Sequence, residues 1–409
     1  MQIRQYHSQQ GDHFYSTPLN WVLFFGSVFF FVANLFAAIS IFPGYSLAIG
    51  ASPFLAGLQN TTFGVAAVIL RLFLGPAMDK RGPHPLMLAG AFTFATTPLL
   101  LILSPSYEML LAARVYQSVG LAVYLPGVST LAAEMAPEGK IGTYLGASRI
   151  FINLGLLAGP SGALLTVDHF GYNNWFLVSS LTSAFSLALL AAVKTPVVKA
   201  RAEQVITSFG QITRALAEKQ VYPVMAGIAL YSFTYSGVVS FAAVHIETAA
   251  PGIEAAYFFL IHGIAGIAGC LGAGALSDRF GRGKVAWPIL AIVGIGAVTF
   301  SFLPFLPALM VICGIILGLG IQGSSLVFAA WLIDVSKPEL RATTMSLQEN
   351  TIDIFFALSA MVFGAAAQGP GLDTAFLFSG IMIMALILPL SRKTTTIIAR
   401  QNQESKGTR

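Results

Sequence analysis

Twelve apolar stretches dominate the sequence, and each is long enough to cross a lipid bilayer. A helix needs about 20 apolar residues to span the hydrocarbon layer. Backbone N–H and C=O groups find no water there, so a spanning segment must satisfy its own hydrogen bonds as a helix. The sequence therefore predicts an all-α membrane protein with twelve transmembrane helices. The stretches cover residues 20–42, 53–77, 85–104, 107–132, 141–166, 174–193, 222–246, 257–277, 286–305, 308–333, 344–367 and 373–390.

The composition excludes most soluble classes of protein. Only 10% of the residues are charged and 56% are apolar, whereas a soluble domain carries about 25% charged residues. The two cysteines, Cys270 and Cys313, both fall in apolar stretches, so neither a disulfide framework nor a zinc motif is expected. No Gly-x4-Gly-Lys-Ser/Thr loop is present, so the sequence gives no support for direct drive by ATP. We therefore expect no enzyme activity, no cofactor and no metal.

The basic residues indicate the orientation in the membrane. With the N-terminus inside, lysine and arginine fall in the inner loops and in the tails, and none falls in an outer loop. This pattern predicts a multi-pass protein of a bacterial-type inner membrane with both termini in the cytoplasm. The first stretch is too long for a signal peptide, so we expect it to be retained. Because the basic residues alternate along the chain, the net charge of +5 does not indicate a nucleic-acid partner.

One short motif occurs twice, half a chain apart. Its two aspartates, Asp79 and Asp278, are 199 positions apart and follow the second and the eighth stretch. We interpret the chain as two copies of a six-helix bundle, residues 1–193 and 222–409, joined by a cytoplasmic linker at 194–221. The motif residues are Gly75, Asp79, Arg81 and Gly82 in the first copy and Gly274, Asp278, Arg279, Gly281 and Arg282 in the second.

These two loops are predicted to act as latches on the inner face. An aspartate can pair with a nearby arginine and lie at the N-terminus of a neighbouring helix, which would hold one conformation. The alternative is that each is a tight basic loop that serves only the topology. Internal repeats of this kind place a substrate site between the halves, near the bilayer midplane.

The second loop resembles a known family signature. Residues Gly274 to Lys284 closely match Gly-x-Leu-x-Asp-Arg-x-Gly-Arg-x-Lys of the major facilitator superfamily, and the resemblance covers the whole chain. The first loop departs from it, because Ala77 replaces Leu, and Pro83 and Pro85 stand where basic residues are usual. The resemblance implies two six-helix bundles that give alternating access to a small-molecule site.

The fourth stretch resembles a motif of the proton-coupled bacterial drug and arabinose-efflux-like exporters in that family. It reads Leu110-x3-Arg114-x2-Gln117-Ser-Val-Gly120, with Ser118 where Gly is usual. In the family this motif is associated with proton coupling.

The fifth stretch is similar to the antiporter motif of the same branch. It contains Gly146-x8-Gly155-x3-Gly159-Pro160, although the Gly pair usual after it is replaced. Small residues let helices approach closely, and proline removes a backbone donor and bends the helix. The resemblance implies that the bend at Gly155, Gly159 and Pro160 supports export.

Two arginines lie inside these stretches. A charge at the centre of a membrane helix costs about 2.5–3.5 kcal/mol on insertion scales, so Arg114 should face the bundle interior. Gln117 shares its helical face, and the pair is predicted to bind an anionic group or respond to proton movement; the alternative is a purely structural pair. Arg149 and Asn153 share a face of the fifth stretch and are predicted to line a cavity, unless Arg149 extends to the inner surface near Glu134.

Two acids in the eleventh stretch are predicted to carry protons. Glu349 and Asp353 are four residues apart and share a helical face. Repulsion between them and the loss of hydration both favour the protonated form of one. The alternative is that Glu349 only pairs with Arg341. The charges inside the stretches are arginines in the first half and acids in the second. This division suits a zwitterionic ligand held between the halves, or equally an ion pair between the halves that opens and closes.

Other polar residues are weaker site candidates. Asn34 is predicted to face the cavity, Tyr231 and Tyr235 to stack on a ligand, and Gln322 to add a polar contact. Aromatic residues at helical spacing serve packing more often than binding, so that alternative stays open for both tyrosines.

From these features we predict a secondary transporter that exports a small molecule by proton antiport. Uptake by proton symport or facilitated diffusion is the alternative, and an intramembrane enzyme or receptor is a distant third. The expected partners are a small-molecule substrate, protons and the lipid bilayer, with no nucleic acid and no obligate protein partner.

Overall fold

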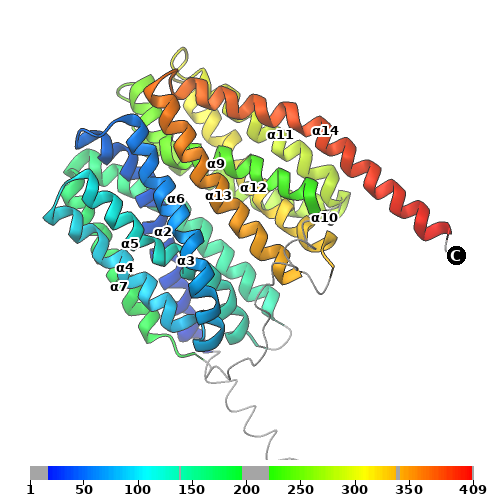
Figure 1. Cartoon of the computed structure of the whole chain (residues 1–409), viewed down its shortest axis with the longest axis horizontal. Helices are drawn as coiled ribbons and strands as arrows, with labels where there is room; N and C mark the ends of the chain where they lie inside the picture. Colours follow the sequence, from blue (N-terminus) through cyan, green and yellow to red (C-terminus); the bar gives the residue numbers. More distant parts are fainter. Residues whose placement is uncertain (1–16, 138–139, 196–220, 338–340, 408–409) are drawn as a thin grey trace, which may run out of the picture. The chain divides into compact units, whose positions relative to one another are not determined.

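The computed structural model describes residues 17–137, 140–195, 221–337 and 341–407, and these ranges contain twelve long α-helices and no strand (Figure 1). Each predicted stretch coincides with one helix, so the all-α transmembrane fold is confirmed. The first six are α2 (Pro18–Ala48), α3 (Pro53–Arg81), α4 (Pro83–Leu103), α5 (Tyr107–Met135), α6 (Ile141–Phe170) and α7 (Tyr172–Ala192). The second six are α9 (Val221–Ala249), α10 (Ala255–Phe280), α11 (Arg282–Ser301), α12 (Leu309–Val335), α13 (Arg341–Gln368) and α14 (Leu372–Gly407).

Among the described residues, eleven segments have the length and hydropathy of a membrane span. One of them, residues 143–192, contains two helices, α6 and α7. The break between them is Gly171, whose φ of +81° only glycine adopts readily. The eleven segments therefore contain all twelve described helices.

The backbone carries independent signs of an internal repeat. In the described ranges, six glycines have positive φ, and they form three pairs with members 199 to 202 positions apart. Each pair occupies corresponding connections, between the first and second, second and third, or fifth and sixth helix of a half. The pairs are Gly50 with Gly252, Gly82 with Gly281, and Gly171 with Gly371.

The described helices form two compact units. The first contains α2, α3 from Thr62 onwards, and α4 to α7; the second contains α9 to α14 and the Ser52–Thr61 segment of α3. Most of the predicted linker, residues 196–220, lies outside the described ranges. The first turns of α3 therefore belong to the second unit. The predicted division, with residues 1–193 in the first bundle, placed all of α3 in the first unit.

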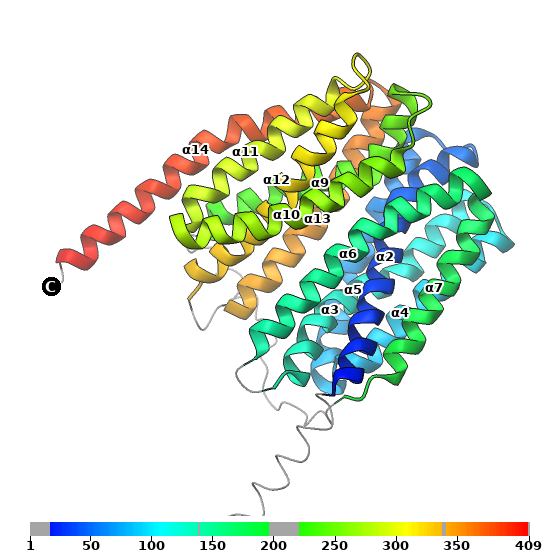
Figure 2. The ribbon, with the colours of Figure 1, turned by 180° about the vertical axis from the view of Figure 1, so that it is seen from behind.

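The same helix pairs recur in both units. In the first unit α2 packs on α6 and α7, and α4 packs on α5 and α7 (Figure 2). In the second, α9 packs on α13 and α14, and α11 packs on α12 and α14. The two halves thus share one packing scheme.

The contact between α2 and α6 depends on two glycines of the fifth-stretch motif. A Cβ at Gly159 would lie 2.1 Å from the Ala33 carbonyl oxygen, and one at Gly155 would lie 3.0 Å from the Ala33 nitrogen. Pro160 lies within α6 directly after this contact. Glycine here lets the two backbones touch, as small residues do in membrane helix pairs.

We expect Gly159→Ala to destabilise the protein by about 1–3 kcal/mol, because the added methyl group overpacks the α2–α6 contact. Gly162→Ala is the matched control, since no heavy atom lies within 4 Å of a Cβ at that position on the same helix. The measurement is the thermal unfolding midpoint of the detergent-solubilised protein. Equal midpoints for the two variants would contradict the assignment.

Candidate functional site

Arg114 of α5 is completely buried within the first unit. Its guanidinium carbon lies 3.8 Å from the ring centre of Phe63 and 5.0 Å from that of Phe42. Its Nη1 donates to Gln117 Oε1 at 2.6 Å. The bond to Gln117 is the contact expected for a structural pair, and two aromatic rings from α3 and α2 enclose the charge. The role of the pair in anion binding or proton movement stays a prediction.

This arrangement keeps a full positive charge away from water. Cation–π contacts contribute about 0.5–2 kcal/mol each and increase in strength as water is excluded. The planar guanidinium is also a forked donor that matches a carboxylate or a phosphate. The cluster can therefore recognise an anionic group with a positive charge that is already positioned.

Asn34, by contrast, joins two helices of the first unit. Its Nδ2 donates to Phe30 O at 2.9 Å and to Thr182 Oγ1 at 2.8 Å. Its Oδ1 accepts from Ser179 Oγ at 2.9 Å and from Thr182 Oγ1 at 3.1 Å. These bonds tie α2 to α7, so the described contacts of Asn34 are structural, and its predicted place in a cavity stays a prediction.

The second predicted pair of the first unit lies apart from the Arg114 cluster. Arg149 is exposed on α6, and Asn153 is half-buried. Exposure of Arg149 is compatible both with a cavity lining and with a side chain that reaches the inner surface. Their role as cavity lining stays a prediction.

In the second unit the structure joins two residues that the sequence left separate. The Tyr235 hydroxyl on α9 hydrogen-bonds the Gln322 side chain on α12. Gly266 of α10 makes room for this contact, because a Cβ there would lie 2.7 Å from Gln322 Cγ. Tyr231, one turn before Tyr235, is buried and stacks against Phe328 with ring centres 6.3 Å apart. These residues form a polar and aromatic cluster that could hold a ring-containing molecule.

The two predicted acids lie on α13 in the same unit. Glu349 and Asp353 are both half-buried and one helical turn apart. The ring of Phe356, which follows on the next turn, meets the edge of the Tyr235 ring at 5.4 Å between centres. The acids are therefore close along α13 to the helix turn that contacts Tyr235.

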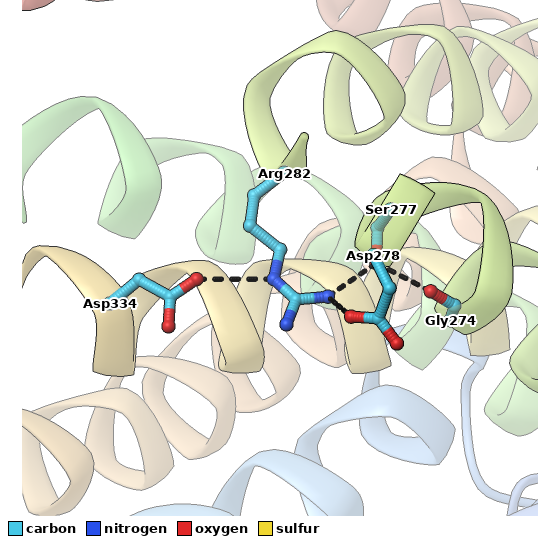
Figure 3. A network of polar contacts seen from close by, with 5 residues as sticks. All are labelled: Gly274, Ser277, Asp278, Arg282 and Asp334. Atoms are coloured by element: carbon cyan, nitrogen blue, oxygen red, sulfur yellow. Dashed lines mark hydrogen bonds and ion pairs between the residues drawn. The ribbon is translucent and has the colours of Figure 1, made fainter. Parts of the chain in front are cut away.

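The second basic loop contains an arginine held by two carboxylates (Figure 3). Arg282, at the start of α11, binds Asp278 Oδ1 at 2.5 Å through Nη1 and Asp334 Oδ2 at 3.1 Å through Nε. Its Nη1 also donates to Ser277 Oγ at 2.6 Å. Asp278, Arg282 and Asp334 form a clamp that ties the end of α10, the start of α11 and the end of α12.

Asp334 was not among the residues predicted from the sequence. A signal was available, because Asp334 near the end of α12 lies 200 positions after Glu134 near the end of α5. The neighbouring predicted residues are also placed: Gly281 has a φ of +93° between α10 and α11, and Arg279 lies over the Phe280 ring at 5.2 Å. Gly274 accepts a bond from Ser277 Oγ through its carbonyl at 2.9 Å.

The first basic loop is built differently. Pro83 occupies the position that corresponds to Arg282, so it cannot supply the central cation of such a clamp. Gly82 has a φ of +82°, Arg81 is exposed, and a Cβ at Gly75 would meet no atom within 4 Å. The side chain of Asp79 lies outside the described part of the structure. A latch at this loop stays a prediction.

The comparison with protein families decides the identity of the fold. The sequence profile of the Major Facilitator Superfamily matches residues 23–332 and, in a second overlapping match, residues 274–407. The chain belongs to the Major Facilitator Superfamily. The family and the relatives matched here are transporters and not enzymes.

Two curated relatives are named for drug resistance. The chain is 29% identical over 133 residues to the multi-drug resistance efflux pump PmrA of Streptococcus pneumoniae, which covers 32% of this chain and 33% of the relative. It is 24% identical over 151 residues to the quinolone resistance protein NorA of Staphylococcus aureus, which covers 36% of this chain and 39% of that one. The chain thus spans only about a third of the length of these relatives.

Solved structures of Major Facilitator Superfamily members share the fold over almost the whole chain. The nucleoside transporter NupG aligns with a TM-score of 0.75 at 15% identity, over 92% of this chain and 99% of its own. A bacterial homologue of the human lysosomal transporter Spinster aligns with a TM-score of 0.70 at 14% identity, over 93% and 98%. At these identities the likeness concerns the fold alone.

We expect Arg282→Gln to loosen the junction of α10 and α11, because it removes the cation that two carboxylates share. The partly exposed pairs contribute about 0–1 kcal/mol each, so amide hydrogen exchange in residues 277–284 should become a few times faster. Arg282→Lys should be intermediate, since it keeps the charge but loses the planar fork. Lys284→Gln, which removes an exposed charge two residues away, is the control; equal exchange in all variants would show that the clamp does not hold the junction.

Proposed function

We propose that this chain is a secondary transporter that exports a small drug-like molecule in exchange for protons. The observation that carries the proposal is the buried Arg114, held by Gln117 and enclosed by Phe42 and Phe63. A charge that costs so much to bury is kept in a membrane helix where a ligand or a proton relay requires it. The names of the two curated relatives support drugs as the substrate class.

Proton coupling is assigned to the acids of α13. Asp353 lies one turn from Glu349 on α13, and both side chains are half-buried. Protonation removes a negative charge from the second unit while Arg114 keeps its positive charge in the first. The change in charge balance shifts the population between the two access states.

The basic loops act as the inner latch in this cycle. The Asp278–Arg282–Asp334 clamp holds three helix ends together, and the loop at Asp79 is its counterpart. Release and re-formation of these contacts accompany the change of access. Substrate and protons are the proposed partners, and no obligate protein partner is included.

The proposed location is the bacterial inner membrane, with both termini in the cytoplasm. The twelve described helices and the basic residues near the ends of α3, α10 and α14 support this orientation. The residues proposed for binding or coupling are Arg114 and Gln117 in the first unit and Tyr231, Tyr235, Gln322, Glu349 and Asp353 in the second. Asn34, Arg149 and Asn153 are not needed for the proposal.

Uptake by symport is the second candidate, because the same fold supports either direction of transport. Everted membrane vesicles distinguish the two. An exporter driven by protons accumulates its substrate when the vesicle lumen is acidic, whereas a symporter moves the substrate out under the same gradient. Ethidium and a fluorescent quinolone are suitable probes, because they report their own accumulation.

In such vesicles we expect Asp353→Asn to abolish accumulation above equilibrium, since the side chain no longer exchanges a proton. Arg114→Gln should lower accumulation about tenfold or more, the factor expected when a hydrogen bond to a charged group is lost. Glu108→Gln, which neutralises an exposed acid in the first turn of α5, should accumulate the probes like the parent. If the first two variants also match the parent, the site assignment is wrong.

A further inference from the structure

Two consecutive carbonyl groups of α13 accept hydrogen bonds from other helices. Ser236 Oγ on α9 donates to Phe356 O at 2.7 Å, and Thr61 Oγ1 on α3 donates to Ala357 O at 2.8 Å. The contact of Thr61 with the carbonyl of Gly57 in its own helix is longer, at 3.4 Å. The hydroxyl of Thr61 is therefore directed at α13 more than at its own helix.

The Ser236 bond is on the peptide group that is hydrogen-bonded to Asp353, and the Thr61 bond is on the next peptide group of the same turn. In an α-helix the N–H of residue 357 donates to the C=O of residue 353. The same peptide group carries the Phe356 carbonyl that Ser236 binds. Hydrogen bonds in series polarise one another, so the hydroxyl of Ser236 strengthens the bond that fixes the backbone of Asp353. Ser236 and Thr61 thus hold the turn of α13 on which Asp353 depends.

The segment that carries Thr61 is docked closely on the second unit. A Cβ at Gly57 would lie 2.1 Å from Ala360 O and 2.9 Å from Gly364 Cα, so the backbones of α3 and α13 are in direct contact. Asn60 Nδ2 also donates to Ser240 Oγ on α9 at 3.1 Å. Residues Ser52–Thr61 therefore touch both helices that meet at the Phe356–Ala357 turn.

The same turn contacts the polar and aromatic cluster of the second unit. Tyr235, next to Ser236 in the chain, forms a T-shaped ring pair with Phe356 and hydrogen-bonds Gln322. A displacement of Tyr235 by a ligand would be transmitted to Phe356 through the ring contact and through the Ser236 bond. The turn is thus connected to a candidate binding residue on one side and to the candidate proton carrier on the other.

We propose that Thr61 and Ser236 are positioning residues that couple the Tyr235–Gln322 pair and the Ser52–Thr61 segment to Asp353. They act through the Phe356–Ala357 turn and touch neither substrate nor proton. This inference rests on the proposed proton-coupled transport, in which Asp353 carries the proton. It assigns a coupling role to the hydroxyl groups of two uncharged residues.

The test compares two modes of transport in reconstituted vesicles with a labelled quinolone as probe. The first mode is accumulation driven by a proton gradient; the second is counterflow exchange without a gradient, which requires folding and substrate binding but no net proton movement. We expect Thr61→Val and Ser236→Ala each to lower driven accumulation about fivefold, the factor that one ordinary hydrogen bond provides, and to leave counterflow unchanged. Thr351→Val is the matched control, because its hydroxyl donates to the Leu347 carbonyl of its own helix, at 2.8 Å.

Asp353→Asn separates this inference from the function on which it rests. If Asp353→Asn still accumulates the probe, the proposed proton coupling fails. If Asp353→Asn loses accumulation while Thr61→Val and Ser236→Ala keep it, only the positioning role is overturned. An equal loss of both transport modes would also overturn it, because a purely structural defect affects both.

Discussion

The structure depends on the rule that backbone N–H and C=O groups in hydrocarbon must be bonded within the protein. Helices satisfy this rule by themselves, and this explains why every described apolar stretch is helical. Polar side chains follow the same rule. Many serine and threonine hydroxyls donate to a carbonyl one turn earlier in their own helix, as Ser40 does to Phe36 and Ser46 to Phe42. A hydroxyl that binds a different helix is therefore the informative exception, and Ser236 and Thr61 are of that kind.

Because the backbone hydrogen bonds of each helix lie within that helix, the same helix pairs can recur in both halves with different polar side chains. The paired glycines with positive φ keep corresponding turns in both halves. At the second basic loop this scaffold carries Arg282 between two carboxylates, whereas the first loop has Pro83 at the same place. Proline suits the first turn of a helix, where its missing N–H has no partner to lose. The helix start is thus preserved while the clamp is not.

The sequence predicted the helices and the family well, because both depend on local hydropathy and on contiguous motifs. It also predicted the contact of Arg114 with Gln117, since residues three apart on a helix are neighbours by geometry. It did not reveal Phe42 and Phe63 around Arg114, or Asp334 beside Arg282, because these partners come from distant parts of the chain. Asn34 is a different case. A polar residue in an apolar stretch predicted a place in the cavity, and its described bonds join α2 to α7.

These cases separate two uses of a polar group inside a membrane protein. In Asn34 both ends of the amide are bonded to neighbouring helices, and such a group fixes packing. The Arg114 guanidinium bonds Gln117 and lies against the faces of Phe42 and Phe63, which stabilise its charge by cation–π contact. A ring can be displaced from a guanidinium at a smaller cost than a carboxylate bonded to it, because the cation–π contact is the weaker interaction. For the proposed role of Arg114, aromatic contacts of this kind suit the reversible binding of an anionic group better than a bonded carboxylate does.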